Sequence, residues 1–557
     1  MRLWICVLAL LSFAGCQAAQ EPAQPVTVLS AQRIYTSNPQ QPQAQAIAWG
    51  EDGRIVAVGE TDALLKQYPK ARRIELPQAT LVPGLIDAHG HVMGLGLALL
   101  QADLVGTGSK DEVLARLREF EKTLPAGAWL TGRGWDQNDW PEKSFPTAAD
   151  LDAAFPDRPV WLERIDGHAS WANSAALKRA AEKEPRLLSA DWQPEGGRIL
   201  RDGGKPTGVF IDRAGALVDA VVPPADDATY ARALQAALQA AVANGLTGVH
   251  DMGVSREALA LMRKFADAGK LPLRIDAYAD GDDDALADLC ANGLYTHPGG
   301  RLQMHGVKLY MDGALGSRGA ALLEDYNDDH GNRGLLVTDP AAFEAAVRKA
   351  KDCGVQVATH AIGDRGNRIV LDTYEKVLGA DAKTDHRWRI EHAQVVSPDD
   401  IPRFAQLGVI ASMQPTHATS DMPWAEDRLG PQRVLGAYAW QRFLKSGARL
   451  ALGSDFPVES VDPRLGLYAA VTRQDRAGQP PGGWQPDQKL SLTEALRGFT
   501  ADAAWAGGDE KEVGQLAPGL HADFVVLKDD PFALPESELD DMQVESTWVD
   551  GKAVFGK

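Results

Sequence analysis

Cysteine is scarce in this chain. Of its four cysteines, two lie in the N-terminal apolar segment, which leaves Cys290 and Cys353 for the folded protein. Both fall within predicted helices, which favours two buried thiols over a disulfide pair. Two thiols this far apart in the sequence also cannot supply the cysteine cluster of a zinc finger.

An excess of positive charge is absent too. The chain has 57 basic and 76 acidic residues, a net charge of −19, and no stripe of lysine and arginine. This balance argues against a nucleic acid partner. No internal repeat, low-complexity tract or Gly-x-Ser-x-Gly sequence is present, and the last absence argues against a serine hydrolase.

Long apolar runs are missing except near the N-terminus. Leu3 to Ala14 is apolar and follows Arg2, but it is too short to cross a bilayer as a mature helix. Its end, Phe13-Ala14-Gly15-Cys16, resembles a bacterial lipoprotein signal, in which the cysteine is lipidated and becomes the new N-terminus. We therefore expect a signal peptide over residues 1–16, lipidation at Cys16 and a tether over residues 17–24.

The residue after Cys16 is Gln17 rather than aspartate. By resemblance to the sorting of Gram-negative lipoproteins, this predicts an exported protein on the periplasmic side of the outer membrane, attached only through its lipid. Cleavage nearby, which would give a soluble periplasmic protein, and retention of the segment as an anchor are the alternatives.

The two ends of the chain have the same β-type character. Residues 25–38, 44–60 and 71–82 read as short strands, and so do residues 522–527, 545–549 and 552–555. Asp550-Gly551 between the last two is a strong hairpin signal. A chain of 557 residues is expected to form two or three domains. We predict that residues 25–82 and 506–557 together form a small β-sandwich around an inserted domain over residues 83–505.

Strand and helix patterns alternate within that insertion. Between most of the strands lie helical stretches over 226–244, 255–268, 339–351, 365–378, 398–406 and 431–445, and another over 493–506 follows the last strand. Eight strands with intervening helices predict an α/β fold, a (β/α)₈ TIM barrel. The long gap after the first strand predicts a tryptophan-rich subdomain inserted over about residues 95–225. The predicted strands are Leu81–His89, Thr247–Met252, Leu273–Tyr278, Val307–Met311, Val355–His360, Trp388–His392, Val409–Met413 and Leu450–Asp455.

Polar side chains gather where these strands end. His89 and His91 are two residues apart, so they share one face at the end of the first strand. Lys308 lies in the fourth strand between apolar neighbours, while His360, His392 and Asp455 end the fifth, sixth and eighth strands. In a barrel of this type, catalytic groups come from the C-terminal strand ends, so these six side chains are expected to converge on one rim.

Each of these residues alone has an ordinary structural interpretation. A histidine at a strand end is often only hydrogen-bonded, a lysine is often solvated, and an aspartate after Gly-Ser is often a helix cap. Those interpretations would have to hold at all six positions together. Neutral imidazole is also a common metal ligand, and the set therefore predicts a metal centre.

The sequence resembles the amidohydrolase superfamily and, within it, the YtcJ-like branch (amidohydrolase family 3). The resemblance covers nearly the whole chain after the N-terminal segment. It is carried by Pro83 to His91, Gly134 to Trp140, Asp166-Gly167-His168 with Asn173-Ser174, Lys308 to Arg318, Thr359 to Asp364, Glu391-His392, Met413 to His417 and Gly453 to Val458.

The resemblance implies a ligand set and a reaction. His89, His91 and Asp455 would hold a first divalent metal, His360 and His392 a second, and Lys308 would bridge them as an N6-carboxylated lysine. The metal would be zinc by preference, with one or two ions bound. Asp455 would act as general base and acid while a metal-activated water hydrolyses the C–N bond of an amide, an N-formyl or N-acyl amine, or a cyclic amide.

Substrate contacts are expected on the same rim from Trp135, Asp136, His168, Arg318, Gln414 and His417. The substrate is a small molecule, and relatives in this branch are commonly homodimers. His250 and Asp251, at the end of the second strand, either support the site or are only structural.

Two other functions stay open. A mononuclear deaminase of the same superfamily would need an acid–base glutamate near the fifth strand and no bridging lysine, whereas here Ala361-Ile362-Gly363 follow His360 and Lys308 is present. A non-catalytic surface lipoprotein that binds metal or solute is the other alternative, against which the complete ligand set argues.

Overall fold

The computed structural model describes residues 25–125, 127–281 and 284–556. The signal peptide, the tether and Cys16 therefore lie outside the described residues. Among the helices of the described ranges, none combines the length and the apolar character that crossing a bilayer requires.

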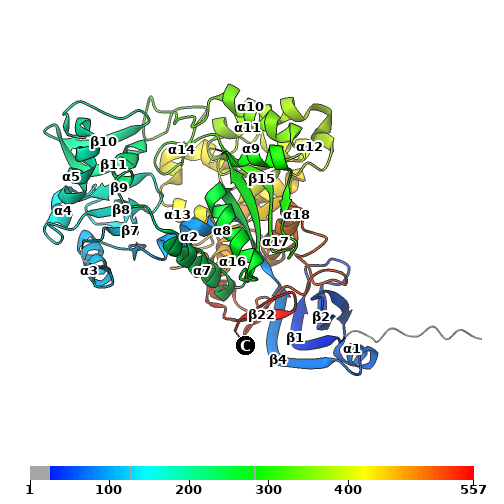
Figure 1. The fold of residues 1–557 in the computed structure, drawn as a ribbon. Helices are drawn as coiled ribbons and strands as arrows, with labels where there is room; N and C mark the ends of the chain where they lie inside the picture. The colour runs from blue at the N-terminus through cyan, green and yellow to red at the C-terminus, as the bar shows by residue number, and fades with distance from the viewer. Residues whose placement is uncertain (1–24, 126, 282–283, 557) are drawn as a thin grey trace, which may run out of the picture.

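Eight parallel strands form the barrel, as predicted (Figure 1). Hydrogen bonds from Asp455 N to the His89 carbonyl (2.7 Å) and from His91 N to the Phe456 carbonyl (2.8 Å) join the last strand to the first. The closure therefore brings His89 and His91, after the first strand, next to Asp455, after the last strand. The strands are β5 (Leu85–Gly90), β12 (Leu246–Val254), β13 (Arg274–Asp280), β15 (Leu302–Tyr310), β16 (Gln356–Ala361), β17 (Arg389–His392), β18 (Ile410–Met413) and β19 (Leu450–Leu452), with short β14 (Tyr295–Thr296) antiparallel to β15.

The helices between the strands start at residues that suit helix N-termini. Side chains of Asp226, Ser255 and Asp339 each accept a backbone N–H in the first turn of the helix that follows. The barrel helices are α2 (Val92–Ala98), α7 (Asp227–Ala243), α8 (Arg256–Asp267), α9 (Ala285–Asn292), α10 (Pro340–Asp352), α11 (Asp364–Leu378), α12 (Ile401–Leu407), α13 (Pro415–Asp421), α14 (Ala425–Arg433), α15 (Trp440–Ser446), α16 (Pro463–Thr472), α17 (Leu492–Gly498) and α18 (Ala501–Gly507).

The insertion after β5 forms a lobe of its own, at the left of Figure 1. Its sheet has the order β10-β11-β9-β8-β7-β6. Trp135, Trp140 and Trp171 are buried together in its core, which accounts for the tryptophan content of this region. The elements are β6 (Ala102–Asp103), α3 (Lys110–Glu121), β7 (Leu130–Trp135), α4 (Ala148–Asp152), β8 (Val160–Arg164), β9 (Ala169–Ala172), α5 (Ser174–Lys183), β10 (Gly197–Asp202), β11 (Lys205–Asp212) and α6 (Ala216–Asp219).

The two chain ends share one seven-stranded sheet, in the order β22-β21-β20-β4-β1-β2-β3. β4 and β20 join its halves, with Pro83 opposite Phe524. Asp550 and Gly551 both have positive φ (53° and 66°), as a two-residue hairpin turn requires. The elements are β1 (Thr27–Tyr35), β2 (Gln43–Trp49), β3 (Ile55–Gly59), α1 (Thr61–Gln67), β4 (Arg72–Pro83), β20 (Phe524–Leu527), β21 (Val544–Val549) and β22 (Lys552–Phe555).

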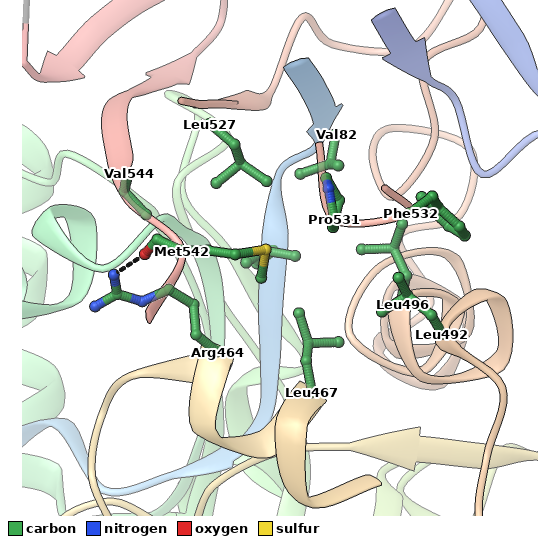
Figure 2. A pocket seen from close by; sticks show the side chains of 11 residues that line it. Val82, Arg464, Leu467, Leu492, Leu496, Leu527, Pro531, Phe532, Met542 and Val544 are labelled. Atoms are coloured by element: carbon green, nitrogen blue, oxygen red, sulfur yellow. Dashed lines mark hydrogen bonds between the residues drawn. The ribbon is translucent and has the colours of Figure 1, made fainter. Parts of the chain in front are cut away.

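An apolar seam joins this sheet to the barrel (Figure 2). Leu467 and Leu496 from the barrel helices face Leu527 and Met542 across it. At one end of the seam, the Arg464 guanidinium donates a hydrogen bond to the Met542 carbonyl. The sheet thus packs where the barrel strands begin, at Leu85 of β5 and at Arg274 of β13, which pairs with Asp523. This is the end of the barrel opposite the rim that carries the predicted ligands.

The prediction of two free thiols is wrong. Cys290 and Cys353 form a disulfide, with their Cα atoms 5.1 Å apart. Cys290 lies in α9, and Cys353 directly follows α10. The two residues are 63 positions apart in the sequence, so their proximity follows from the side-by-side packing of two barrel helices, which helical periodicity alone does not reveal.

Candidate metal centre

The barrel rim brings the predicted ligands together. The imidazole rings of His89 and His392 lie 4.8 Å apart, and those of His360 and His392 lie 4.6 Å apart. Lys308 Nζ lies 3.2 Å from His89 Nε2, and this lysine is only 1% exposed. Four strand ends far apart in the sequence therefore contribute to one buried cluster.

Asp455 completes the first group of ligands. Its Oδ1 atom lies 3.0 Å from His91 Nε2 and 3.5 Å from His89 Nε2. These three residues form one of two groups in the described part of the chain whose spacing could hold a metal ion, and the other group consists of His392, His417 and Asp455. Asp455 belongs to both groups.

Hydrogen bonds fix which ring nitrogen of each histidine faces this cluster. His91 Nδ1 donates to the Met252 carbonyl at 2.7 Å, so its Nε2 carries a lone pair. His89 Nδ1 donates to Glu391 Oε2 at 2.6 Å, with the same consequence. His392 Nδ1 lies 2.9 Å from Gln414 Oε1 and donates to it. All three rings thus point an electron pair into the centre.

This arrangement fits a divalent cation. His91 Nε2 and Asp455 Oδ1 are both acceptors, yet they face each other at 3.0 Å, a contact that is repulsive unless a positive charge lies against both. Within the described ranges, Asp455 Oδ1 and His360 Nε2 are also buried without a hydrogen-bond partner, and buried polar atoms normally have one. The donor set of imidazole and carboxylate matches zinc chemistry.

The electrostatics of the centre keep its histidines neutral. Burial, together with the charge of Lys308, lowers the pKa of His89 to about 4 and that of His360 to about 3. Burial also lowers the pKa of Lys308 to about 8. The Lys308 amine is therefore neutral more often than a solvated lysine, and the neutral amine is the form that can add CO₂.

His417 lies next to Asp455. It comes from α13, and its Nε2 is 3.2 Å from Asp455 Oδ2 while its Nδ1 is 3.2 Å from Glu459 Oε1. Despite the opposing effect of burial, these two acidic partners raise the pKa of His417 to about 10, so both ring nitrogens donate. His417 thus occupies one Asp455 oxygen and leaves the other facing the ligands.

His168 approaches from the inserted subdomain. It follows β8, its backbone N–H donates to Asp166 Oδ1 at 3.0 Å, and its charge contributes to the lowered pKa of His360. His417 therefore contacts Asp455, and the charge of His168 acts on His360. The role of both residues in substrate binding stays a prediction.

The other four residues predicted to contact substrate form hydrogen bonds or ion pairs within the protein. Trp135 is 0% exposed, and its indole donates to the Leu162 carbonyl at 3.2 Å, so it packs in the subdomain core. Asp136 accepts the Asn138 N–H at 2.8 Å at the start of a short 3₁₀ helix. Gln414 orients His392. Arg318 is paired with Asp328, at 2.9 Å.

Two buried charged residues beneath the centre, Arg389 and Glu391, were not predicted to have a role there. The alternation of β17 offers a signal, because these residues are two apart in a short strand that ends at a predicted ligand, His392, and must share a face. His250, left open above, belongs with them, since its Nδ1 accepts from Arg389 at 2.9 Å. Asp251 accepts the Val92 N–H at 2.9 Å and so fixes the start of α2.

The chain matches a known protein family over most of its length. Residues 72–555 match the model described as the amidohydrolase family. The chain belongs to this family. Residues 51–71 also match the imidazolonepropionase-like composite domain of bacteria. As the motifs predicted, the chain is a hydrolase of carbon–nitrogen bonds.

Several relatives cover nearly the whole amidohydrolase chain. The "putative amidohydrolase YtcJ" of Bacillus subtilis (strain 168) is 36% identical and covers 94% of this chain and 98% of its own. The N-substituted formamide deformylase of Arthrobacter pascens is 30% identical over 90% of this chain and 93% of its own. The crystal structure of an uncharacterized metal-dependent hydrolase from Pyrococcus horikoshii OT3 has a TM-score of 0.76 at 28% identity, covering 92% of this chain and 99% of that one.

Proposed function

We propose that this amidohydrolase uses a divalent metal to hydrolyse the amide bond of a small N-formyl or N-acyl amine, or of a cyclic amide. The observation that carries the proposal is the approach of the unpartnered Asp455 Oδ1 to the Nε2 atoms of His91 and His89, at 3.0 and 3.5 Å. Similarity to a formamide deformylase supports the substrate class.

A divalent ion held by His89, His91 and Asp455 would polarise the scissile carbonyl and make the attacking water more acidic. Asp455 accepts a proton from that water and returns it to the leaving nitrogen, so that the amide becomes a carboxylic acid and a free amine. His417 donates to Asp455 Oδ2 and thereby holds the carboxylate in this orientation. His168, whose charge acts on the ligand His360, would contact the substrate in this proposal.

The ion is zinc in this proposal, and Lys308 is N6-carboxylated. Support comes from the buried Lys308 amine, 3.2 Å from His89 Nε2, and from the unpartnered Nε2 of His360. A carbamate on Lys308 would bring an anionic oxygen ligand between the His89 and His360 sides of the cluster. Carbon-13 NMR after incubation with labelled bicarbonate tests it: a carbamate resonance that is lost in Lys308→Ala supports the proposal, and its absence in the wild type contradicts it.

The test of the function combines metal analysis with one substitution. We expect purified protein to contain stoichiometric metal, and a chelator to abolish hydrolysis of a panel of N-formyl amines, N-acyl amines and cyclic imides. Asp455→Asn should lower kcat by about 10²–10⁴-fold while most of the metal is retained. Asp328→Asn, which removes a carboxylate that faces Arg318 rather than the ligands, is the control. Wild-type turnover in Asp455→Asn would refute the assigned role.

We also propose that the protein is an exported lipoprotein of the outer membrane. The Cys290–Cys353 disulfide supports export, because such bonds persist in oxidising compartments such as the periplasm. Mass spectrometry of the mature N-terminus tests the anchor. A diacylglyceryl group on Cys16, lost in Cys16→Ala, is expected, and an unmodified N-terminus elsewhere would contradict it.

A further inference from the structure

His89 is anchored differently from its neighbours. His91 and His392 donate their Nδ1 protons to neutral oxygens, a backbone carbonyl and the Gln414 side-chain amide. His89 donates to a carboxylate, that of Glu391, at 2.6 Å, and both side chains are 0% exposed. A charge-assisted hydrogen bond of this kind is shorter and stronger than a neutral one.

Arg389 in turn holds Glu391. Its Nε donates to Glu391 Oε1 at 2.5 Å, and its Nη2 donates to Oε2 at 3.0 Å. This two-point contact fixes the plane of the carboxylate and stabilises its negative charge, which would be costly if it were buried alone. Glu391 therefore cannot rotate away from His89 without breaking an ion pair in the barrel interior.

Arg389 also binds the backbone that carries His89. Nη2 donates to the carbonyl of Ala88, the residue before His89, at 2.6 Å, and to Ser412 Oγ at 2.6 Å. Nη1 donates to His250 Nδ1 at 2.9 Å. One guanidinium group thus connects β5, β12, β17 and β18 at the centre of the barrel, and it contacts both the main chain next to His89 and the carboxylate under its ring.

We infer that Arg389 and Glu391 are positioning residues for His89. The pair fixes the ring with its proton on Nδ1, directs the Nε2 lone pair at the ion, and makes this imidazole a stronger electron donor than one held by a neutral oxygen. The inference rests on the proposed metal centre, and it assigns a function to a buried charged pair that the hydrolytic steps themselves do not use.

Metal affinity, measured without substrate, tests the inference. Glu391→Gln keeps the size of the side chain and removes its charge, so we expect zinc affinity in a chelator competition to fall about 10–100-fold. We also expect the visible absorption of the cobalt-substituted protein to shift, because the donor strength of one ligand changes. Ser412→Ala, which removes one partner of Arg389 and leaves the Glu391–His89 contact intact, should lose far less zinc affinity than Glu391→Gln, because no partner of a ligand is removed.

Two further variants test the inference even if Glu391→Gln does not fold. Glu391→Asp retains the charge, so we expect it to restore part of the affinity lost in Glu391→Gln, and Arg389→Lys should lose affinity because lysine cannot hold both oxygens. Near-ultraviolet circular dichroism reports whether each variant is folded. Wild-type affinity and an unshifted cobalt spectrum in folded Glu391→Gln would overturn the inference. If that variant does not fold, wild-type affinity in both Glu391→Asp and Arg389→Lys would overturn it.

The proposed function and the role of Arg389 and Glu391 can be refuted independently of each other. A wild-type protein that binds zinc tightly but hydrolyses no amide would refute the proposed function and leave this inference standing. Amide hydrolysis that needs zinc, combined with unchanged zinc affinity in the Glu391 and Arg389 variants, would do the reverse.

Discussion

The histidines of the rim make the stability of the metal-free protein depend on pH. Burial lowers the pKa of His89 to about 4 and that of His360 to about 3, whereas an unfolded histidine titrates near 6.5. Below pH about 6.5 the unfolded chain therefore binds protons that the folded chain does not. Above that pH neither state binds these protons, so the proton-linked loss is absent. Stability is lost as the pH falls below about 6.5 towards 4 and 3.

We expect urea unfolding of the metal-free protein to show this loss between pH 7 and 4. Each such histidine contributes a slope of up to about 1.4 kcal/mol per pH unit. His360→Asn should reduce the slope, while the same change at the exposed His330 should not. Equal slopes for the wild type and His360→Asn would contradict the role of burial.

Trp135 is predicted to matter for stability rather than for substrate binding. Because its side chain is 0% exposed among Trp140 and Trp171, Trp135→Ala should destabilise the inserted subdomain by about 3–5 kcal/mol. Thermal unfolding followed by tryptophan fluorescence measures this, with Trp192→Ala, a partly buried position of the same subdomain, as the milder control. An unchanged Tm with a raised KM would instead support a substrate contact.

At the residue scale, the sequence predicts which side chains stand at strand ends but not what they touch. His89, His91, His360, His392 and Asp455 are identifiable because strand ends of a barrel share one rim. The partner of Gln414 is His392 on β17, and the partner of Arg318 is Asp328, ten residues further along the irregular segment between β15 and α10. Neither partner is fixed by local spacing, and so both residues were expected to contact substrate.

At the element scale, the eight barrel strands are predictable because each is a short apolar run between turn residues. The helices between the strands are less predictable. The helix predicted over 431–445 is interrupted. α14 is kinked at Gly430, with φ of 72°, and ends at Arg433, and α15 begins only at Trp440. The predicted helix over 493–506 is likewise divided into α17 and α18.

The link between α9 and α10 gives a prediction at this scale. Cys290→Ser with Cys353→Ser removes a bridge across 63 residues and should destabilise the protein by about 2–4 kcal/mol. The Tm of the wild type should fall to that of the double variant in the presence of reductant. A double variant as stable as the oxidised wild type would show that helix packing alone holds the pair.

At the scale of the whole molecule, one arginine ties the inserted subdomain to the metal centre. Arg133 donates to the carbonyl of Pro457, two residues after Asp455, at 2.6 Å, and to that of Ile165, near His168, at 2.5 Å. It therefore connects the segment that leads to His168 with the segment that follows Asp455. The inserted subdomain and the segment that follows Asp455 are therefore expected to move together.

Arg133→Ala should release this connection. We expect faster hydrogen exchange in residues 163–168 and 456–458 and, on a cleaved substrate, a KM several-fold higher with a smaller change in kcat, because loop positioning affects binding more than the proton transfer at Asp455. Arg198→Ala, on the exposed surface of the same subdomain, is the control. Unchanged exchange in both segments would contradict the coupling.

The strand order of the end sheet has a consequence for how the protein is made. During synthesis β1 to β4 emerge first, but the free edge of β4 pairs only with β20, which begins at Phe524. Until the last part of the chain leaves the ribosome, this edge offers unsatisfied amides to any passing strand. Newly made chains should therefore need protection by a chaperone for almost the whole of translation, and nascent chains truncated before Phe524 should aggregate through β4.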